Sequence, residues 1–141
     1  MSMDFGLSGR RALVTGASSG LGLACARSLA AEGAEVLIVA RSAERLDAAA
    51  ATISGDVLSL VGDVSSMGAV GDMVATAESM LGGIDILIAN AGGPPPGDFA
   101  STDLNLYEPA LHLNLLSSVA MCKATVPAMQ ERGWGLSLIH I

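Results

Sequence analysis

Short apolar runs alternate with stretches of helical periodicity along the chain, and this alternation constrains the fold more than any other feature. The apolar runs occupy residues 11–15, 35–40, 57–61 and 84–89. The helical stretches between them occupy residues 20–31, 43–53 and 67–81. Each strand, its following helix and the next strand together span roughly 30 residues, the size of a right-handed crossover. The order therefore predicts an α/β fold, a doubly wound parallel sheet with helices on both faces.

The last third of the chain departs from this regular alternation. The segment Gly92–Gly97 contains three consecutive prolines, so it is predicted to be a surface loop. A long helix is expected over Leu106–Glu131, with Pro127 bending or shortening its last turns. The final six residues, Leu136–Ile141, are predicted as a fifth short strand, so the sheet is truncated after about five strands.

The first predicted helix has an apolar stripe that should face the sheet. Residues Leu21, Ala24, Cys25 and Leu29 lie along this stripe. Gly33 follows as a suitable left-handed cap. We expect Cys25, like Cys122 in the long helix, to be a reduced core residue.

Length and charge limit the classes of function. A chain of 141 residues forms one domain, and its net charge of −7 with 3% aromatic residues argues against nucleic-acid binding. The chain carries no metal-ligand spacing, no secretory leader pattern and no apolar run of membrane-spanning length, which predicts a cytoplasmic protein without metal. Because the protein as a whole is negatively charged, an anionic ligand must be bound by a local group of hydrogen-bond donors or positive charges.

A glycine-rich segment, Thr15–Gly22, lies between the first predicted strand and helix. Glycine lets the backbone approach a pyrophosphate, and the following helix start supplies unpaired N–H groups with a partial positive charge. The alternative is a tight turn with no ligand; a P-loop is excluded because no Lys-Ser/Thr pair follows the glycines. The candidate cofactor-binding residues here are Gly16, Ser18, Ser19, Gly20, Leu21 and Gly22.

The end of the second predicted strand bears on the choice between NAD and NADP. A carboxylate there would bind the ribose hydroxyls of NAD, whereas an arginine suits the 2′-phosphate of NADP. This chain has Ala40, Arg41 and Ser42. Arg41 and Ser42 therefore favour NADP(H) over NAD(H), the alternative being that Arg41 is a solvated helix-start residue.

The chain carries four short motifs in order: the glycine loop Thr15–Gly22, the pair Asp63-Val64, the triplet Asn90-Ala91-Gly92, and Asn114 in the long helix. Together they resemble the motifs of the short-chain dehydrogenase/reductase family, over about residues 8 to 135. The resemblance implies a Rossmann-type fold that binds NAD(P) through the first three motifs. It also implies a homo-oligomeric parent protein.

Three of these residues have two interpretations each. Asp63 would accept a hydrogen bond from the adenine amino group, or it caps the following helix. Asn90 would contact the cofactor or tie neighbouring strand ends together. In the family the position of Asn114 serves a proton relay through water, which makes it the candidate catalytic residue; alternatively it is an exposed helix asparagine.

The tyrosine and lysine that the family uses four residues apart are missing. A free tyrosine is a poor base until a nearby cation favours its phenolate. The single tyrosine, Tyr107, and the single lysine, Lys123, are too far apart to form such a pair. His112 has no partner that spacing can identify. We therefore expect these 141 residues to be inactive alone.

The hexapeptide Leu136–Ile141 also differs from the family, which continues this strand into Asn and Ser residues. It resembles a translated sequencing-adapter end. We interpret residues 1–135 as the N-terminal part of one NAD(P)-binding domain and residues 136–141 as an artefactual tail.

These features together predict an NADP(H)-dependent oxidoreductase that transfers hydride between nicotinamide and a small carbonyl or alcohol substrate. The resemblance includes 3-oxoacyl-carrier-protein reductases and does not choose among substrates. The alternative is a non-catalytic nucleotide-binding module. A Rossmann-like methyltransferase is disfavoured by Arg41 and by Asn90-Ala91-Gly92.

Overall fold

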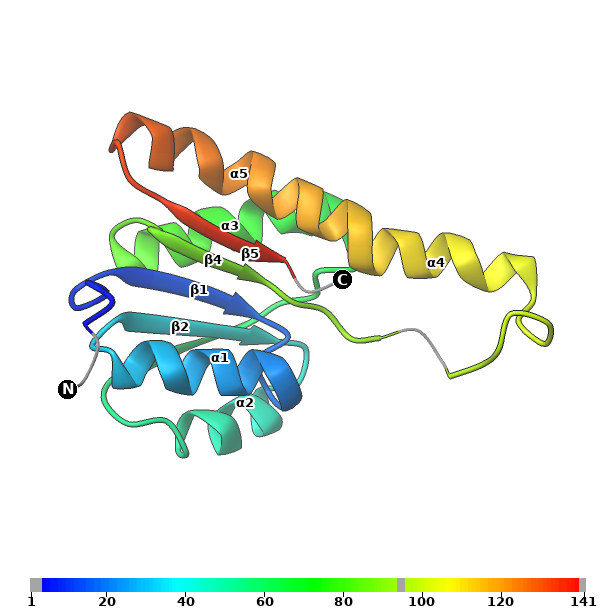
Figure 1. The fold of residues 1–141 in the computed structure, drawn as a ribbon, viewed down its shortest axis with the longest axis horizontal. Coiled ribbons are helices and arrows are strands. Elements are labelled where there is room, and N and C mark those ends of the chain that lie inside the picture. The colour runs from blue at the N-terminus through cyan, green and yellow to red at the C-terminus, as the bar shows by residue number, and fades with distance from the viewer. Residues whose placement is uncertain (1–3, 94–95, 140–141) are drawn as a thin grey trace.

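The computed structural model describes residues 4–93 and 96–139. Five strands form one sheet in the order β3-β2-β1-β4-β5, and every neighbouring pair is parallel (Figure 1). Their bounds are β1 Arg11–Thr15, β2 Glu35–Ala40, β3 Val57–Val61, β4 Ile86–Ala89 and β5 Leu136–Ile139. The predicted α/β fold, a doubly wound parallel sheet of five strands, is confirmed.

Helices cover both faces of this sheet. Helices α1 (Gly20–Ala31) and α2 (Ala43–Ala50) lie on one face, while α3 (Met67–Leu81) and α5 (Ser117–Glu131) lie on the other (Figure 1). Alternate residues of each central strand point to opposite layers, because successive side chains of a strand face opposite sides. Leu13 of β1 packs with the α3 and α5 layer, whereas Ala12 and Val14 pack with the α1 and α2 layer.

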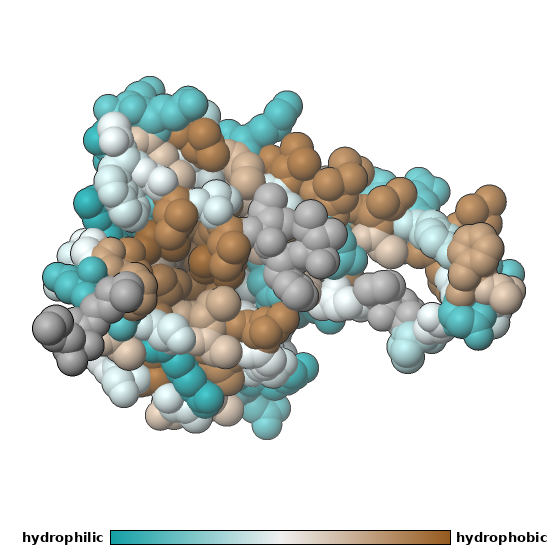
Figure 2. All heavy atoms as spheres, in the orientation of Figure 1, coloured by the Kyte–Doolittle hydropathy of each residue, from teal (hydrophilic) through white to brown (hydrophobic). Residues whose placement is uncertain are grey.

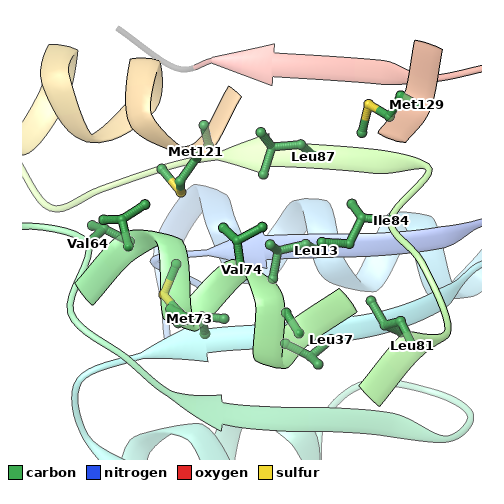
Figure 3. Packing of buried hydrophobic residues seen from close by; sticks show 14 residues of the cluster. Leu13, Leu37, Val64, Met73, Val74, Leu81, Ile84, Leu87, Met121 and Met129 are labelled. Carbon is green, nitrogen blue, oxygen red and sulfur yellow. The ribbon is translucent and has the colours of Figure 1, made fainter. Parts of the chain in front are cut away.

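The core beneath α3 and α5 joins the long C-terminal helix to the sheet. Met121 and Met129 of α5 lie near Leu87 of β4, and Val74 of α3 lies over Leu13 (Figure 3). Flexible methionine side chains fill the irregular space between the two helices. Only one side of α5 takes part in this packing.

Two predicted elements are shorter than expected. Helix α2 ends at Ala50 and not at residue 53, because Thr52 and Ile53 donate their N–H groups to carbonyls three residues back. Strand β4 begins at Ile86 and not at residue 84. The side chain of the preceding Asp85 is bound to Arg11 of β1.

The buried face of α1 differs from the predicted stripe. Gly22, Ala26 and Leu29 are the buried residues, whereas Ala24 is exposed and Leu21 is 57% exposed. Two of these three residues are small, and at Gly22 the helix lies so close to the Gly16 backbone that no side chain fits. The left-handed conformation of Gly33, with φ +82°, is confirmed.

The long helix has an interruption that the sequence did not indicate. It begins with a 3₁₀ turn at Leu104–Leu106, continues as α4 (Tyr107–Leu111), passes through a π-helical turn at His112–Leu116, and ends as α5. Hydroxyl groups in this stretch donate to carbonyls four residues back, a pattern that loosens α-helical geometry. Pro127 lies inside α5, which nevertheless extends to Glu131.

The C-terminal segment forms the edge of the sheet. Leu136–Ile139 pair with β4, and residues 140 and 141 of the predicted strand lie outside the described residues, as do Pro94 and Pro95 of the predicted loop. Cys25 and Cys122 are free, as predicted, and each is half-buried and packs against the edge of a core cluster. Among the described residues, no helix combines the length and apolar character that a membrane crossing requires.

Candidate functional site

The carboxyl ends of β1, β2 and β4 lie at the same edge of the sheet (Figure 1). The glycine loop follows β1, Arg41 follows β2 and Asn90 follows β4. The amide of Ala17 donates to the carbonyl of Val39 at 3.1 Å, so the glycine loop contacts the end of β2. Parallel α/β sheets bind ligands at this edge, where the strand order reverses.

At two positions of the loop only glycine fits, because a side chain there would clash with neighbouring atoms. A Cβ on Gly16 would come within 2.7 Å of Asn90 Nδ2, and Gly16 also has φ +60°. A Cβ on Gly22 would lie 2.4 Å from the carbonyl oxygen of Gly16. These contacts draw the start of α1 against the end of β1, so its first N–H groups stay near the strand edge.

The third glycine has a different role, because the space beside it is open. Gly20 has φ +58°, and a Cβ there would meet no atom within 4 Å. Ser19 and Leu21 beside it are exposed, and Ser18 is half-buried. Ser19 precedes α1 without forming a side-chain cap, so the N–H groups of the first turn remain free of a serine acceptor. The loop thus offers a phosphate-sized anion free N–H donors and open space.

Asn90 ties the glycine loop to the end of β4. Its Nδ2 donates to the carbonyl of Gly16 at 3.2 Å, and its N–H donates to Thr15 Oγ1 at 3.1 Å. Thr15 Oγ1 in turn donates to the carbonyl of Asn90 at 2.8 Å. Asn90 is buried, so these bonds satisfy its polar groups. The geometry supports the strand-tying interpretation of this residue, while a cofactor contact stays a prediction.

The segment after β2 carries positive charge. Arg41 is exposed and Ser42 is half-buried; the hydroxyl of Ser42 accepts from the N–H of Arg45 at 3.3 Å and caps α2. The charge of Arg41 also acts on Asp63 after β3, where it contributes to the lowered pKa of that carboxyl. Arg41 and Asp63 are therefore brought together.

Asp63 is held by a local turn. Its Oδ1 accepts from the N–H of Ser65 at 2.9 Å and from Ser65 Oγ at 2.7 Å. These two bonds are the main cause of its lowered pKa, ahead of the Arg41 charge. The N-cap residue of α3 is Ser66 and not Asp63, so the interpretation of Asp63 as the cap of this helix is wrong. Contact with adenine stays a prediction.

The remaining predicted cofactor residues line the same edge. Val64 is buried in the α3 layer, Ala91 is half-buried against the core, and Gly92 is exposed. Asn114 is separate from them: in the described part of the chain its hydrogen bonds stay within its own helix. Its Nδ2 donates to the carbonyl of Ala110 at 3.0 Å, and its carbonyl accepts from Ser118 Oγ at 2.9 Å.

Sequence reasoning missed one contact of the glycine loop. Arg45 Nη2 in the first turn of α2 donates to Ser19 Oγ at 3.1 Å. Residues 26 positions apart meet here because parallel crossovers bring the starts of α1 and α2 to the same edge. An arginine near a helix start was the available signal in the sequence.

Three residues in the long helix have no contact with this edge in the described part of the chain. Tyr107 begins α4 and is exposed, and His112 lies 4.0 Å from Glu108 on the same helix. Lys123 lines a shallow hollow of about 430 Å³ on α5 with Val119 and Pro127. These positions do not support catalytic roles for Tyr107, His112 or Lys123.

Comparison with known proteins identifies the family. The sequence model for "short chain dehydrogenase" matches residues 10–140. Dehydrogenase/reductase SDR family member 4 of Sus scrofa is 40% identical over 137 residues, 94% of this chain and 49% of the relative. The chain therefore spans about half the length of the curated relatives it matches.

Solved structures give the same result. L-sorbose reductase from Gluconobacter frateurii, complexed with NADPH and L-sorbose, superposes with a TM-score of 0.85 at 34% identity, covering 96% of this chain and 53% of that one. A metagenomic short-chain oxidoreductase in complex with NADP has a TM-score of 0.83 at 32% identity, with 93% and 61% covered. The chain belongs to the short-chain dehydrogenase/reductase family of oxidoreductases.

Proposed function

We propose that this chain is the cofactor-binding part of an NADP(H)-dependent oxidoreductase acting on a carbonyl or alcohol. The observation that carries the proposal is the open glycine loop, with free N–H groups at the start of α1 and Arg41 at the end of the neighbouring strand. When bound, the nicotinamide cofactor would supply or accept the hydride. Its pyrophosphate would lie at Gly20, where the loop leaves room.

The preference for NADP(H) rests on the residues after β2. Arg41 follows β2 at the same edge of the sheet as the glycine loop, and Ala40 supplies no carboxylate that would repel a 2′-phosphate. Two similar proteins of known structure are complexed with NADPH and NADP. Both facts support the 2′-phosphate as the group that Arg41 binds.

Equilibrium binding of NADPH and NADH to this chain tests the preference. We expect NADPH to bind about tenfold or more tightly, because a charge-assisted bond to phosphate is lost with NADH. The variant Arg41→Asp should remove that difference. Arg27→Asp makes the same charge change on α1 and should preserve it. Equal affinities in the unchanged chain would overturn the NADP assignment.

Catalysis by these 141 residues is proposed to be absent. The chain has one tyrosine and one lysine, and the structure places both on the long helix, away from the glycine loop. Asn114 stays the candidate relay residue of the intact parent, by its place in the family's motif; it lies in the π-helical turn, and its carbonyl accepts from Ser118. Measurable oxidation of NADPH with any aldehyde or ketone would contradict this proposal.

A non-catalytic nucleotide-binding module is the second candidate, favoured by the same lack of a Tyr and Lys pair. The gene sequence downstream of Gly135 separates the two. A serine and a Tyr-x-x-x-Lys motif there would support the oxidoreductase, including a 3-oxoacyl-carrier-protein reductase-like substrate class. A natural stop codon would support the binding module. A cytoplasmic location and a homo-oligomeric parent stay predictions.

A further inference from the structure

The contact between Arg45 and Ser19 bridges two elements that border the proposed site. Arg45 is the third residue of α2, and its Nη2 donates to Ser19 Oγ at 3.1 Å. The carboxyl ends of β1 and β2 are adjacent, with Thr15 opposite Val39. The Arg45 guanidinium therefore lies between the glycine loop and the start of α2, beside the segment that holds Arg41.

Arg45 occupies a position that helix energetics disfavour. The start of a helix carries a partial positive charge, and the third helical position after a serine cap is where a glutamate or glutamine stabilises the helix. Here Ser42 caps α2 through the N–H of Arg45, while the Arg45 side chain adds positive charge. Residues that break a local rule in this way gather at functional sites.

Ser19 makes this contact and does not cap α1. A serine before a helix ordinarily accepts from an N–H of the first turn, as Ser42 does at α2. The Ser19 hydroxyl accepts from Arg45 instead and forms no cap bond. The N–H groups at the start of α1 therefore have no serine acceptor, while the Ser19 hydroxyl binds Arg45.

The two arginines near this edge differ in their surroundings. The charge of Arg41 acts on the carboxylate of Asp63, which compensates part of it. Arg45 contacts a neutral hydroxyl, so its charge is not compensated by that partner. In a chain of net charge −7, a second guanidinium at this point supplies positive charge that the glycine loop lacks.

We propose that Arg45 is a second arginine of the adenosine-phosphate site, held by Ser19, and determines specificity for the 2′-phosphate together with Arg41. The inference rests on the proposed binding of NADP(H). One N–H of the guanidinium binds Ser19; Arg45 is exposed, and within residues 4–93 and 96–139 its side chain makes no other hydrogen bond. Both guanidinium groups would contact the phosphate from the α2 side.

Binding of two small probes to the full 141-residue chain tests this proposal. Adenosine 2′,5′-bisphosphate carries the 2′-phosphate and adenosine 5′-monophosphate lacks it, so their affinity ratio reports that group alone. We expect Arg45→Ala to weaken the bisphosphate about tenfold and the monophosphate less than twofold. Arg45→Lys keeps the charge without the fork and should restore part of the ratio.

Arg27→Ala is the matched control. Arg27 Nη2 donates to Thr52 Oγ1 at 2.7 Å, so it also bridges α1 to the α2 segment, but at the far ends of these helices. Its loss should leave the probe ratio unchanged. A merely structural role of Arg45 would weaken both probes equally and would shift the unfolding midpoint.

The outcomes separate this inference from the proposed function. If the unchanged chain binds both probes equally, the NADP preference itself is wrong. If the chain discriminates and Arg41→Ala abolishes the discrimination while Arg45→Ala does not, only the role of Arg45 is overturned. The proposed role of Arg45 is supported if Arg45→Ala lowers the ratio of bisphosphate to monophosphate affinity and Arg45→Lys partly restores it.

Discussion

Two regions of the molecule bury their apolar residues to different degrees. The central region comprises β1, β2, β4 and the glycine loop; the outer region comprises residues 104–139. The side chains of β1 and β2 point alternately to the two faces of the sheet, and helices bury them on both faces. The outer region exposes large apolar side chains on the long helix and on β5: Leu104, Leu106, Leu111, Leu115, Leu116, Val119, Leu136 and Leu138. Apolar residues gather along the long helix in Figure 2.

The difference follows from the number of layers on each element. A central parallel strand is covered above and below, so every side chain has neighbours. Helix α5 packs one side on the sheet and α3, and strand β5 has a neighbouring strand on one side only. The packing of the central region therefore holds the residues of the candidate site in place. The outer region leaves apolar side chains exposed to solvent.

The sharpest test of the central region is Gly22→Ala. Its Cβ would lie 2.4 Å from the Gly16 carbonyl, so backbone must move, and we expect a loss of more than about 4 kcal/mol of unfolding free energy. Urea unfolding measures this loss. Gly71→Ala, on the exposed face of α3 with no atom within 4 Å, should be neutral or stabilising by about 0.5 kcal/mol. A similar loss in both variants would contradict the packing role.

The inner side of the outer helix should behave like the central region. Met121 is 0% exposed and packs near Leu87 and Val64 in the α3 and α5 layer (Figure 3). Met121→Ala should cost about 3 kcal/mol through lost burial and a cavity. Chemical denaturation measures the effect, and a change below about 1 kcal/mol would show that α5 is not firmly packed on the sheet.

Asp85 joins the two regions at the amino end of the sheet. Its carboxylate bonds Arg11 of β1 at 2.8 Å and lies 3.6 Å from Arg132 after α5. The hydrogen bond from Arg11 is the main cause of the lowered pKa of Asp85. We expect Asp85→Asn to cost about 2 kcal/mol at neutral pH, because the amide carries no charge and replaces one acceptor oxygen of this buried side chain by an NH2 donor beside Arg11.

The sign of the pH dependence follows from the lowered pKa of Asp85. The folded state binds fewer protons at this carboxyl than the unfolded state, so the stabilisation is complete above about pH 5 and is lost as pH falls below about 4. Asp85→Asn should flatten this part of the stability curve. Unfolding measured from pH 3 to pH 7 checks it, and parallel curves for both proteins would contradict the ion-pair role.

The exposed side of the outer helix should respond least in stability. Leu115 is 50% exposed, so Leu115→Gln should change the unfolding free energy by no more than about 0.5 kcal/mol. It should still reduce self-association, because an apolar patch is interrupted. Light scattering at increasing concentration measures association. A loss comparable with that of Met121→Ala would remove the distinction between the two sides.

Most of the fold could be predicted from local sequence. The strands at Arg11–Thr15, Glu35–Ala40 and Val57–Val61 have their predicted bounds, because short apolar runs ended by glycine or charge specify buried parallel strands. The helix predicted over 43–53 was too long, because the turn hydrogen bonds of Thr52 and Ile53 do not change the spacing of apolar residues in the sequence. The end of a helix or strand depends on individual hydrogen bonds, which this spacing does not indicate.

The candidate site was less completely predictable. The glycines, Arg41 and Asn90 could be found because residue type and order mark them. The predicted stripe on α1 was half right: Leu29 is buried and Cys25 packs against the core, but Leu21 and Ala24 are exposed, because apolarity alone did not define the buried side. The π-helical turn around Asn114 could not be found, since its hydrogen bonds reach beyond the α-helical spacing.

The sequence by itself determined the succession of strands and helices, the family and the glycine positions, because these depend on local periodicity and on backbone conformations that side chains forbid. Only the tertiary structure decided which face of α1 is buried, how Asn90 holds Gly16, and that Arg45 reaches Ser19. These contacts join residues 26 to 74 positions apart. Parallel crossovers bring such residues to one edge of the sheet, and no local pattern encodes the distance between them.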